Sequence, residues 1–184
     1  MTSMIKAVGA AVLAVSLLCV PARAASPQNT LYLELEWGRV VIEMLPAVAP
    51  KHVARIKQLV RRKFYDGLKF HRVIRGFMAQ TGDPRGDGTG GSGQNIAAEF
   101  STVKHVRGTM SMARASDPNS ADSQFFIMFA PAPFLDGKYT VWGRVISGME
   151  HVDRIRKGLQ RSNGMVQDAD RIVRIRVAAD VDKK

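Results

Sequence analysis

One stretch of the chain places a permanent cation, large apolar side chains and a carboxamide close together. Arg72, Phe77 and Gln80 all lie within it. In an unbroken strand these three side chains would not share a face, because successive side chains point to opposite sides. Gly76 lies between them, and a glycine inside a strand pattern predicts a bulge or bend that shifts the alternation by one residue. We therefore expect a small apolar patch with one fixed positive charge, which suits an apolar ligand that has one carbonyl group to polarise.

Other residues that could perform chemistry show no pattern for it. The four histidines, at positions 52, 71, 105 and 151, lack the spacing of metal ligands. We interpret His71 as structural, with a catalytic role as the alternative. The serines at positions 92, 111 and 123 do not follow the strand–turn–helix pattern that exposes a nucleophile. The motif Gly86-x-Gly88-x-x-Gly91 formally resembles a dinucleotide fingerprint, but no helix pattern follows it. No hydrolysis, metal or cofactor is therefore expected.

The first 24 residues are predicted to be a signal peptide. Lys6 precedes an uncharged apolar run, and Ala22-x-Ala24 is a small-x-small cleavage site. The run covers Ala7 to Val20, which is short for a membrane span of roughly 20 residues. We expect a periplasmic protein, without stable membrane insertion after cleavage, whose residues 25–184 form one domain. Secretion, or anchoring through an uncleaved signal, is the alternative.

Size and charge limit the remaining possibilities. Cleavage after Ala24 would leave 160 of the 184 residues, enough for a core, and would remove Cys19, the only cysteine. Loss of Lys6 and Arg23 would lower the formal net charge from +11 to +9. The basic residues are scattered along the chain, so nucleic-acid binding is not expected despite a pI near 10.3. Attraction to anionic envelope surfaces is the simpler interpretation of this charge.

The hydrophobic pattern predicts a fold dominated by β-structure. Eight strands are expected, at 31–37, 40–45, the stretch from 70, 99–105, 108–113, 124–129, 139–145 and 172–177. Helical spacing predicts one helix from Pro50 to Phe64 and a second from Met149 to near Gly158. The glycines of residues 82–93 predict a loop. Strands in hairpin order favour an eight-stranded antiparallel closed β-barrel capped by two α-helices, because closure removes free strand edges.

Three separated segments resemble one protein family. They are Phe70-His71-Arg72-Val73-Ile74-x-Gly76-Phe77-Met78-x-Gln80-x-Gly82-Asp83, then Gly108-x-x-Ser111-Met112-Ala113 with Asn119 and Ser123-Gln124-Phe125-Phe126-Ile127, and Leu135-Asp136-Gly137-Lys138 with Gly143-Arg144-Val145. Their order and spacing are similar to the cyclophilin family of peptidyl-prolyl cis/trans isomerases, over roughly residues 31–177. The resemblance implies the same barrel with two capping helices, and an active-site groove on its outer face.

The resemblance also implies the residues of that groove. Carried over by position, the catalytic residues are Arg72 and Gln80, and the substrate-binding residues are Phe77, Met78, Ala113, Arg114, Gln124, Phe126, Phe134, Leu135 and Tyr139. Without the resemblance, the apolar members would be interpreted as ordinary core and Arg72 as a surface salt-bridge residue.

Such a site would rotate an X-Pro bond over a barrier of ~18–20 kcal/mol. No bond breaks, so no nucleophile or cofactor is required. Arg72 would donate a hydrogen bond to the prolyl nitrogen, which gains a lone pair only in the twisted transition state. Gln80 would hold Arg72 or contact the rotating carbonyl, and the backbone at Arg114 would clamp the peptide.

Three positions depart from the best-known eukaryotic pattern. Phe134 stands where tryptophan is frequent, Tyr139 where histidine is frequent, and Arg114 where asparagine is frequent; the first two are similar to exported bacterial members. Phe134 lacks an indole N–H, so we expect weak cyclosporin binding. The charge of Arg114 is expected to favour acidic substrates.

The expected partners are proline-containing polypeptides that are folding, and a monomer is expected because a closed barrel exposes no strand edge. The alternative is a proline-peptide binding module or holdase in which turnover is incidental. The presence of both Arg72 and Gln80 favours the enzyme.

Overall fold

The protein forms one curled sheet with helices around it. The structure, a computed structural model, describes residues 25–181 of the chain. The strands are β1 (Thr30–Leu35), β2 (Gly38–Met44), β3 (Arg72–Ile74), β4 (Met78–Thr81), β5 (Thr109–Met112), β6 (Phe125–Met128), β7 (Val141–Ser147) and β8 (Arg174–Val177). The helices are α1 (Pro50–Arg61), α2 (Met149–Arg154) and α3 (Ala178–Val181), with 3-10 turns η1 (Pro27–Asn29), η2 (Pro133–Leu135) and η3 (Gln160–Ser162).

The predicted signal peptide lies outside the described residues. Within residues 25–181, no helix combines the length and the apolar character that crossing a membrane requires.

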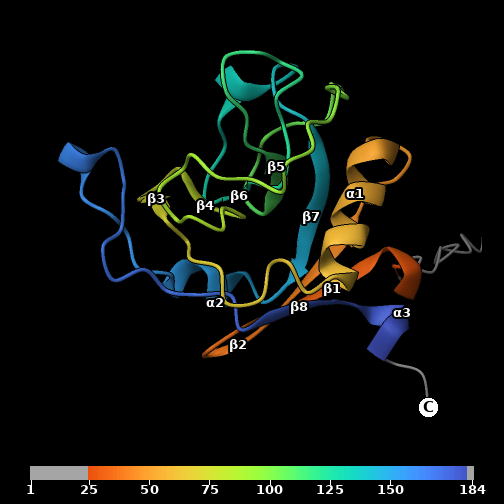
Figure 1. The fold of residues 1–184 in the computed structure, drawn as a ribbon, viewed down its shortest axis with the longest axis horizontal. Helices are drawn as coiled ribbons and strands as arrows, with labels where there is room; N and C mark the ends of the chain where they lie inside the picture. The colour runs from red at the N-terminus through yellow and green to blue at the C-terminus, as the bar shows by residue number, and fades with distance from the viewer. Residues whose placement is uncertain (1–24, 182–184) are drawn as a thin grey trace, which may run out of the picture.

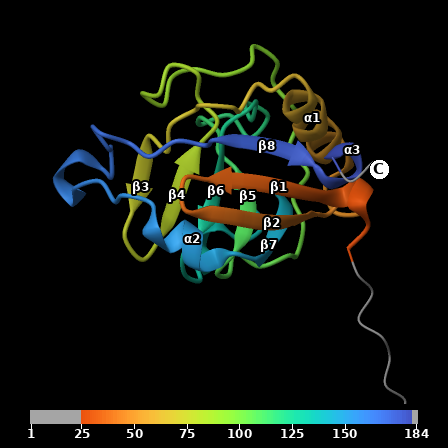
Figure 2. The ribbon, with the colours of Figure 1, turned by 90° about the horizontal axis from the view of Figure 1, so that it is seen from below.

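The eight strands are antiparallel, as predicted, but they do not close into a barrel. Their order is β3-β4-β6-β5-β7-β2-β1-β8, and among the described residues no ladder joins β3 to β8. The prediction of a closed barrel is therefore wrong. The loop that follows α2 lies beside β3 instead (Figures 1 and 2). It supplies isolated contacts, such as the bridge between Arg72 and Met165 and the bond from the Val73 N–H to the Gly164 carbonyl. β3 is only three residues long, and this loop pairs with it in place of another strand.

The stretch from Phe70 to Asp83 is a hairpin and not the single bulged strand that we predicted. Gly76 has φ +70°, a left-handed conformation that suits glycine. It lies in the turn between β3 and β4, so Arg72 pairs directly with Gln80 across the two strands. The two polar residues share a face through cross-strand pairing, and not through a shift of phase within one strand.

Residues 99–105 form no strand, which corrects another prediction. Their backbone and side-chain groups are bonded to other elements. The Glu99 carboxylate accepts the N–H groups of Lys51 and His52 at 3.0 Å each, and the His105 N–H donates to Asp136 at 2.8 Å. Glu99 thereby caps the first turn of α1, because Ala49 before Pro50 has no side-chain cap to offer. Eight strands nonetheless result, since the hairpin contributes two.

The helices are shorter than predicted. α1 ends at Arg61, and Lys63 beyond it has a left-handed φ of +57° that stops the helix. α2 ends at Arg154, because Ile155 turns to an extended ψ of 129° and is fully buried. A third helix, α3, was not predicted; its Asp180 is bonded to Arg61.

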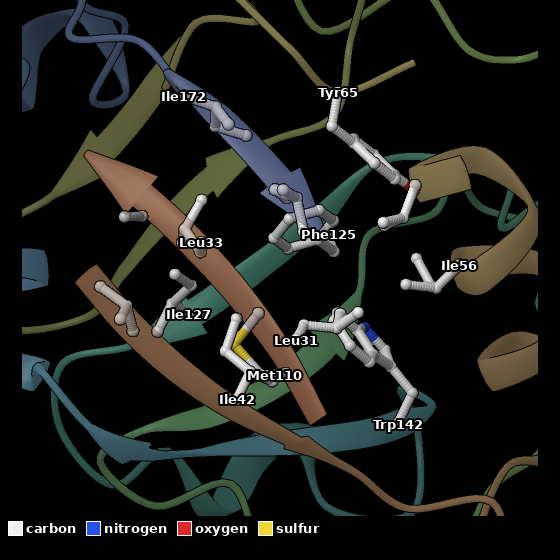
Figure 3. Packing of buried hydrophobic residues seen from close by; sticks show 14 of the residues in the cluster. Leu31, Leu33, Ile42, Ile56, Tyr65, Met110, Phe125, Ile127, Trp142 and Ile172 are labelled. Atoms are coloured by element: carbon white, nitrogen blue, oxygen red, sulfur yellow. The ribbon is translucent and has the colours of Figure 1, made fainter. Parts of the chain in front are cut away.

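The two faces of the sheet bury different clusters. The interior cluster lies inside the curl, where Leu31, Ile42 and Phe125 meet Ile56 of α1 and Trp142 of β7 (Figure 3). The groove cluster lies on the opposite face and consists of Met78, Phe126, Met128, Ala132 and Leu135, with Ile74, Phe77, Ala113 and Tyr139 packed against it. Alternation along each strand divides the side chains between them, so the functional site is built on the outside of the sheet.

Candidate active site

The pairing of three strands positions the central residues of the site. Arg72 on β3 is opposite Gln80 on β4, and Gln80 is opposite Phe126 on β6. Side chains in directly paired positions point to the same face and lie about 5 Å apart at Cβ. The sheet therefore sets a cation, a carboxamide and an aromatic ring in one row.

Arg72 is held on two sides. Its Nη1 donates to Gln80 Oε1 at 3.2 Å. On the other side, its Nε donates to the Asn163 carbonyl and its Nη2 to Asn163 Oδ1, each at 3.0 Å. Asn163 has a left-handed φ of +51° just after η3, which turns its carbonyl and its side chain toward the same guanidinium. The charge is thus oriented by neutral groups.

Two N–H groups of Arg72 remain for a ligand. A guanidinium has five, and three are used in the contacts with Gln80 and Asn163. No carboxylate among residues 25–181 forms an ion pair with Arg72, so it is not an ordinary salt-bridge residue. Partial burial lowers its pKa, but a guanidinium still keeps its charge. The site therefore presents a fixed, uncompensated cation.

The groove cluster forms the apolar floor beside this cation. Met78, Phe126 and Leu135 are 1%, 5% and 6% exposed. Phe77 is half-buried, and its ring lies 5.6 Å from that of Phe134, which is 63% exposed. Tyr139 meets the Phe126 ring edge-on at 6.0 Å. An exposed aromatic side chain above a buried apolar floor is suited to binding a small apolar ring.

Arg114 closes one rim of the groove. Its guanidinium lies over the Tyr139 ring at 4.6 Å and donates to the carbonyl of Lys138 at 3.1 and 3.3 Å. It also donates to the carbonyls of Ala115 and Ser116. In the described part of the chain, neither the N–H nor the C=O of Arg114 is hydrogen-bonded within the protein. Its side chain is pinned while its backbone remains available to a peptide.

A cavity of about 560 Å³, lined by both polar and apolar groups, adjoins the apolar floor. The glycine-rich loop lines it, together with Gln80, Ala113, Arg114 and Gln124. Gln124 is bonded to Gln80 at 2.9 Å and donates to the carbonyls of Gly88 and Gly90. The bonds from Arg72 through Gln80 and Gln124 therefore continue into the loop.

Asp83 organises that loop from within. Its carboxylate accepts the N–H groups of Arg85, Asp87 and Gly88, and it is 1% exposed. Burial alone would raise the pKa of Asp83, but backbone N–H groups of the loop, those of Arg85 and Gly88 foremost, hold the pKa below its usual value. The region predicted as a loop is thus an ordered wall of the cavity.

His71 is fully buried, and neither ring nitrogen has a hydrogen-bond partner. Desolvation lowers its pKa, so the ring is neutral at neutral pH. This agrees with a structural residue. Among residues 25–181, no three His, Cys, Asp or Glu side chains are grouped as a metal site.

The structure places all eleven predicted site residues in one connected set, through the hydrogen bonds of Arg72, Gln80 and Gln124 and the contacts of the groove cluster with Phe134 and Arg114. Sequence reasoning missed Asn163, which supplies two of the three bonds to Arg72. The Asn163-Gly164 pair is a recognisable turn signal, but it lies 91 residues from Arg72 in sequence. Its contact with the site follows only from the loop beside β3.

Comparisons with known proteins identify the family of this chain. Residues 30–177 match the family model described as Cyclophilin type peptidyl-prolyl cis-trans isomerase/CLD. A relative from Brucella suis, named a probable peptidyl-prolyl cis-trans isomerase, is 53% identical over 171 residues, covering 86% of this chain and 87% of the relative. A relative from Aspergillus oryzae, named peptidyl-prolyl cis-trans isomerase-like 1, is 42% identical over 150 residues, covering 78% of this chain and 91% of the relative.

Solved structures agree. A cyclophilin from Hirschia baltica has a TM-score of 0.78 and 30% identity, covering 88% of this chain and 78% of its own. A cyclophilin-type isomerase from Cryptosporidium parvum, solved in the presence of the dipeptide Ala-Pro, has a TM-score of 0.73 and 30% identity, covering 80% of this chain and 98% of its own.

The fold and site therefore define a peptidyl-prolyl cis-trans isomerase. The chain belongs to the cyclophilin family, as the resemblance in its sequence predicted.

Proposed function

We propose that this protein accelerates X-Pro rotation in folding polypeptides by using Arg72 to stabilise the twisted amide. The observation that carries the proposal is how Arg72 is held and which of its N–H groups are left unbonded. Gln80 and Asn163 fix it beside the groove cluster, two of its N–H groups are free, and it has no carboxylate partner in the described structure. A planar amide nitrogen accepts hydrogen bonds poorly, whereas the twisted one has a lone pair. The bond is therefore specific to the transition state.

The required rate enhancement shows how much the site must stabilise the transition state. Uncatalysed isomerisation takes roughly 10–100 s. Reaching milliseconds needs about 10⁴–10⁵ in rate, or about 5.5–7 kcal/mol. One charge-assisted hydrogen bond contributes only ~1.5–3 kcal/mol. Fixing the proline over Phe126 and Leu135, and desolvating its amide there, must supply the remainder.

Gln80 acts in this proposal as a positioning residue. Its Oε1 accepts from Arg72 while its Nε2 donates to Gln124, so both ends of the amide are engaged. This geometry favours the first of the two expected roles, which is to hold Arg72. The unbonded backbone of Arg114 is suited to clamping the peptide as a short added strand.

An isomerisation assay on an Ala-Pro peptide tests the mechanism. We expect Arg72→Ala to lose about 100-fold or more in kcat/KM, because the transition-state bond and its orientation are both lost. Arg75→Ala is the matched control, since Arg75 is an exposed arginine in the turn of the same hairpin. Equal activity of the two variants would refute the role of Arg72. A wild type no faster than solvent would favour the peptide-binding module instead.

The strength of inhibitor binding is expected to depend on the side chain at position 134. Phe134 is exposed at the rim of the groove and has no N–H donor, so we propose that cyclosporin binds weakly while isomerase activity is retained. Inhibition by cyclosporin at low nanomolar concentration would contradict this.

A preference for the charge of the substrate is expected from Arg114, at the opposite rim of the groove. The Arg114 guanidinium is bonded to carbonyls and to no carboxylate within residues 25–181, so its charge is not neutralised locally. We propose that peptides with Glu beside the proline react faster than those with Lys. The preference should disappear at high salt, because screening weakens exposed charge interactions.

Export and a monomeric state are also proposed. The apolar run and cleavage site at residues 7–24 support cleavage into the periplasm. Cell fractionation and the mass of the mature chain test export. Light scattering of the purified domain tests the monomer, which the loop-covered edge at β3 supports.

A further inference from the structure

A buried chain of hydrogen bonds lies directly behind the groove cluster, and the proposed mechanism does not use it. His105 is 1% exposed. Its Nδ1 lies 3.0 Å from Asp136 Oδ1, and its Nε2 lies 3.0 Å from Ser111 Oγ. Ser111 is fully buried, and its Oγ also lies 3.0 Å from the Thr140 carbonyl. The four groups form one continuous chain.

The number of protons allows two arrangements of this chain. The Asp136 carboxylate only accepts hydrogen bonds, so Nδ1 of His105 carries a proton in both. Ser111 has one hydroxyl proton and two neighbouring acceptors. When His105 is neutral, that proton points to Nε2. When His105 is charged, Nε2 itself donates to Ser111, and the hydroxyl turns to the Thr140 carbonyl. The charge of His105 therefore sets the direction of the Ser111 hydroxyl.

The surroundings of the ring favour the neutral arrangement at neutral pH. Two charged groups flank it: Asp136, and Lys104, whose Nζ lies 3.3 Å from Asp136 Oδ2. Desolvation lowers the pKa of His105, and the hydrogen bond and charge of Asp136 only partly oppose this. The ring therefore becomes charged only in acid.

The chain reaches the wall of the groove at three points. The His105 ring is stacked on that of Phe126, with centroids 6.3 Å apart and an interplanar angle of 24°. Ser111 is directly opposite Phe126 in the pairing of β5 with β6. Asp136 immediately follows Leu135 at the end of η2. A change in this chain of hydrogen bonds can therefore reach Phe126 and Leu135, two of the side chains in the apolar floor.

We propose that His105 is a positioning residue of the isomerase, whose neutral form, tied to Asp136 and Ser111, holds Phe126 and Leu135 in the geometry that receives proline. This inference rests on the proposed function of the groove. In acid, a charged ring lies against the apolar wall and the Ser111 hydroxyl turns away. Isomerase activity then falls while the protein is still folded.

Two variants separate this role from simple stability. His105→Phe keeps a flat ring against Phe126 but removes both side-chain hydrogen bonds. His52→Gln is the matched control, because His52 is also fully buried and bonded to a carboxylate, Glu99 at 2.7 Å, but lies on α1 away from the groove cluster. Activity is measured by NMR exchange, without a protease, on an acetylated and amidated Ala-Ala-Pro-Phe peptide, from about pH 8 to about pH 4.5. Circular dichroism at each pH shows that the protein is folded.

We expect the wild type to show a fall in kcat/KM in acid and His52→Gln to retain the same profile. His105→Phe should lose about tenfold at neutral pH and show no acid step of its own. A His105→Phe enzyme that keeps the wild-type rate and profile would overturn the proposal.

A titration of the wild type covers the case in which His105→Phe does not fold. The ring signals of Phe126 should shift at the pH where His105 becomes charged. Phe126 signals that do not follow His105 would overturn the proposal even then. A wild type that is inactive at every pH would remove the proposed function itself, and the titration would still decide whether His105 positions Phe126.

Discussion

Phe125 and Phe126 are neighbours in sequence and both are buried, at 1% and 5% exposure, yet they serve different regions. Phe125 meets Trp142 and Tyr65 edge-on at 5.5 and 5.4 Å within the interior cluster. Phe126 contacts His105 and Tyr139 on the groove side. The interior residue packs within the large core cluster and faces no open site. The groove residue has polar groups behind it and an open site in front, so burial by itself does not separate core from function.

The largest effect is expected from Phe125→Ala. The interior cannot refill the space that the ring leaves, so we expect a loss of about 3–5 kcal/mol in the free energy of unfolding. Denaturant unfolding measures it. The fraction that remains folded should retain its kcat/KM, because Phe125 does not contact the groove. A Phe125→Ala variant that is stable but has low activity would contradict the assignment of Phe125 to the core alone.

Phe126→Ala should reduce activity more than stability, the opposite of Phe125→Ala. Its stability loss should be smaller than that of Phe125→Ala, since water from the groove can enter the truncated site. Removing one wall of the proline site should lower kcat/KM by about 10- to 100-fold, equivalent to the burial energy of one aromatic side chain. Unfolding and isomerisation are measured on the same sample. A pure stability defect would show that Phe126 is only core.

Asn163→Gly sharpens the comparison at the polar edge of the groove. Glycine keeps the left-handed backbone and its carbonyl bond to Arg72, and removes only the side-chain bond. We expect up to about tenfold loss in kcat with little change in stability. Ser162→Gly, in the same exposed turn, is the control. An unchanged kcat would mean that Gln80 and the backbone carbonyl of residue 163 together suffice to orient Arg72.

Acid should lower the stability of the folded protein through the carboxylate of Glu99. Burial would raise the pKa of this carboxylate, but His52 and two helix N–H groups hold the pKa below its usual value. A group with a depressed folded-state pKa stabilises the protein above its unfolded pKa, and that stability is lost as pH falls through the folded value. The melting temperature should fall below about pH 4.5, and Glu99→Gln should reduce this dependence. An identical pH profile for the variant would exclude Glu99.

The sequence by itself determined which residues could act. The order of motifs containing Arg72, Gln80 and Phe126 identified the family, because those spacings are specific to it. Period-two alternation assigned neighbouring side chains to opposite faces, which the interior and groove clusters confirm. Local glycine and proline signals placed α1 and the loop of residues 82–93.

Only the tertiary structure decided how these residues are held. The residue pattern is compatible with Gly76 making a bulge within one strand or a turn between two, and the backbone pairing of β3 with β4 decides for the turn. Three features join segments that are far apart in sequence. They are the loop contacts at the edge of β3, the contact of Asn163 with Arg72, and the chain of hydrogen bonds from Asp136 to Ser111. Such contacts follow from packing, which composition and periodicity do not specify.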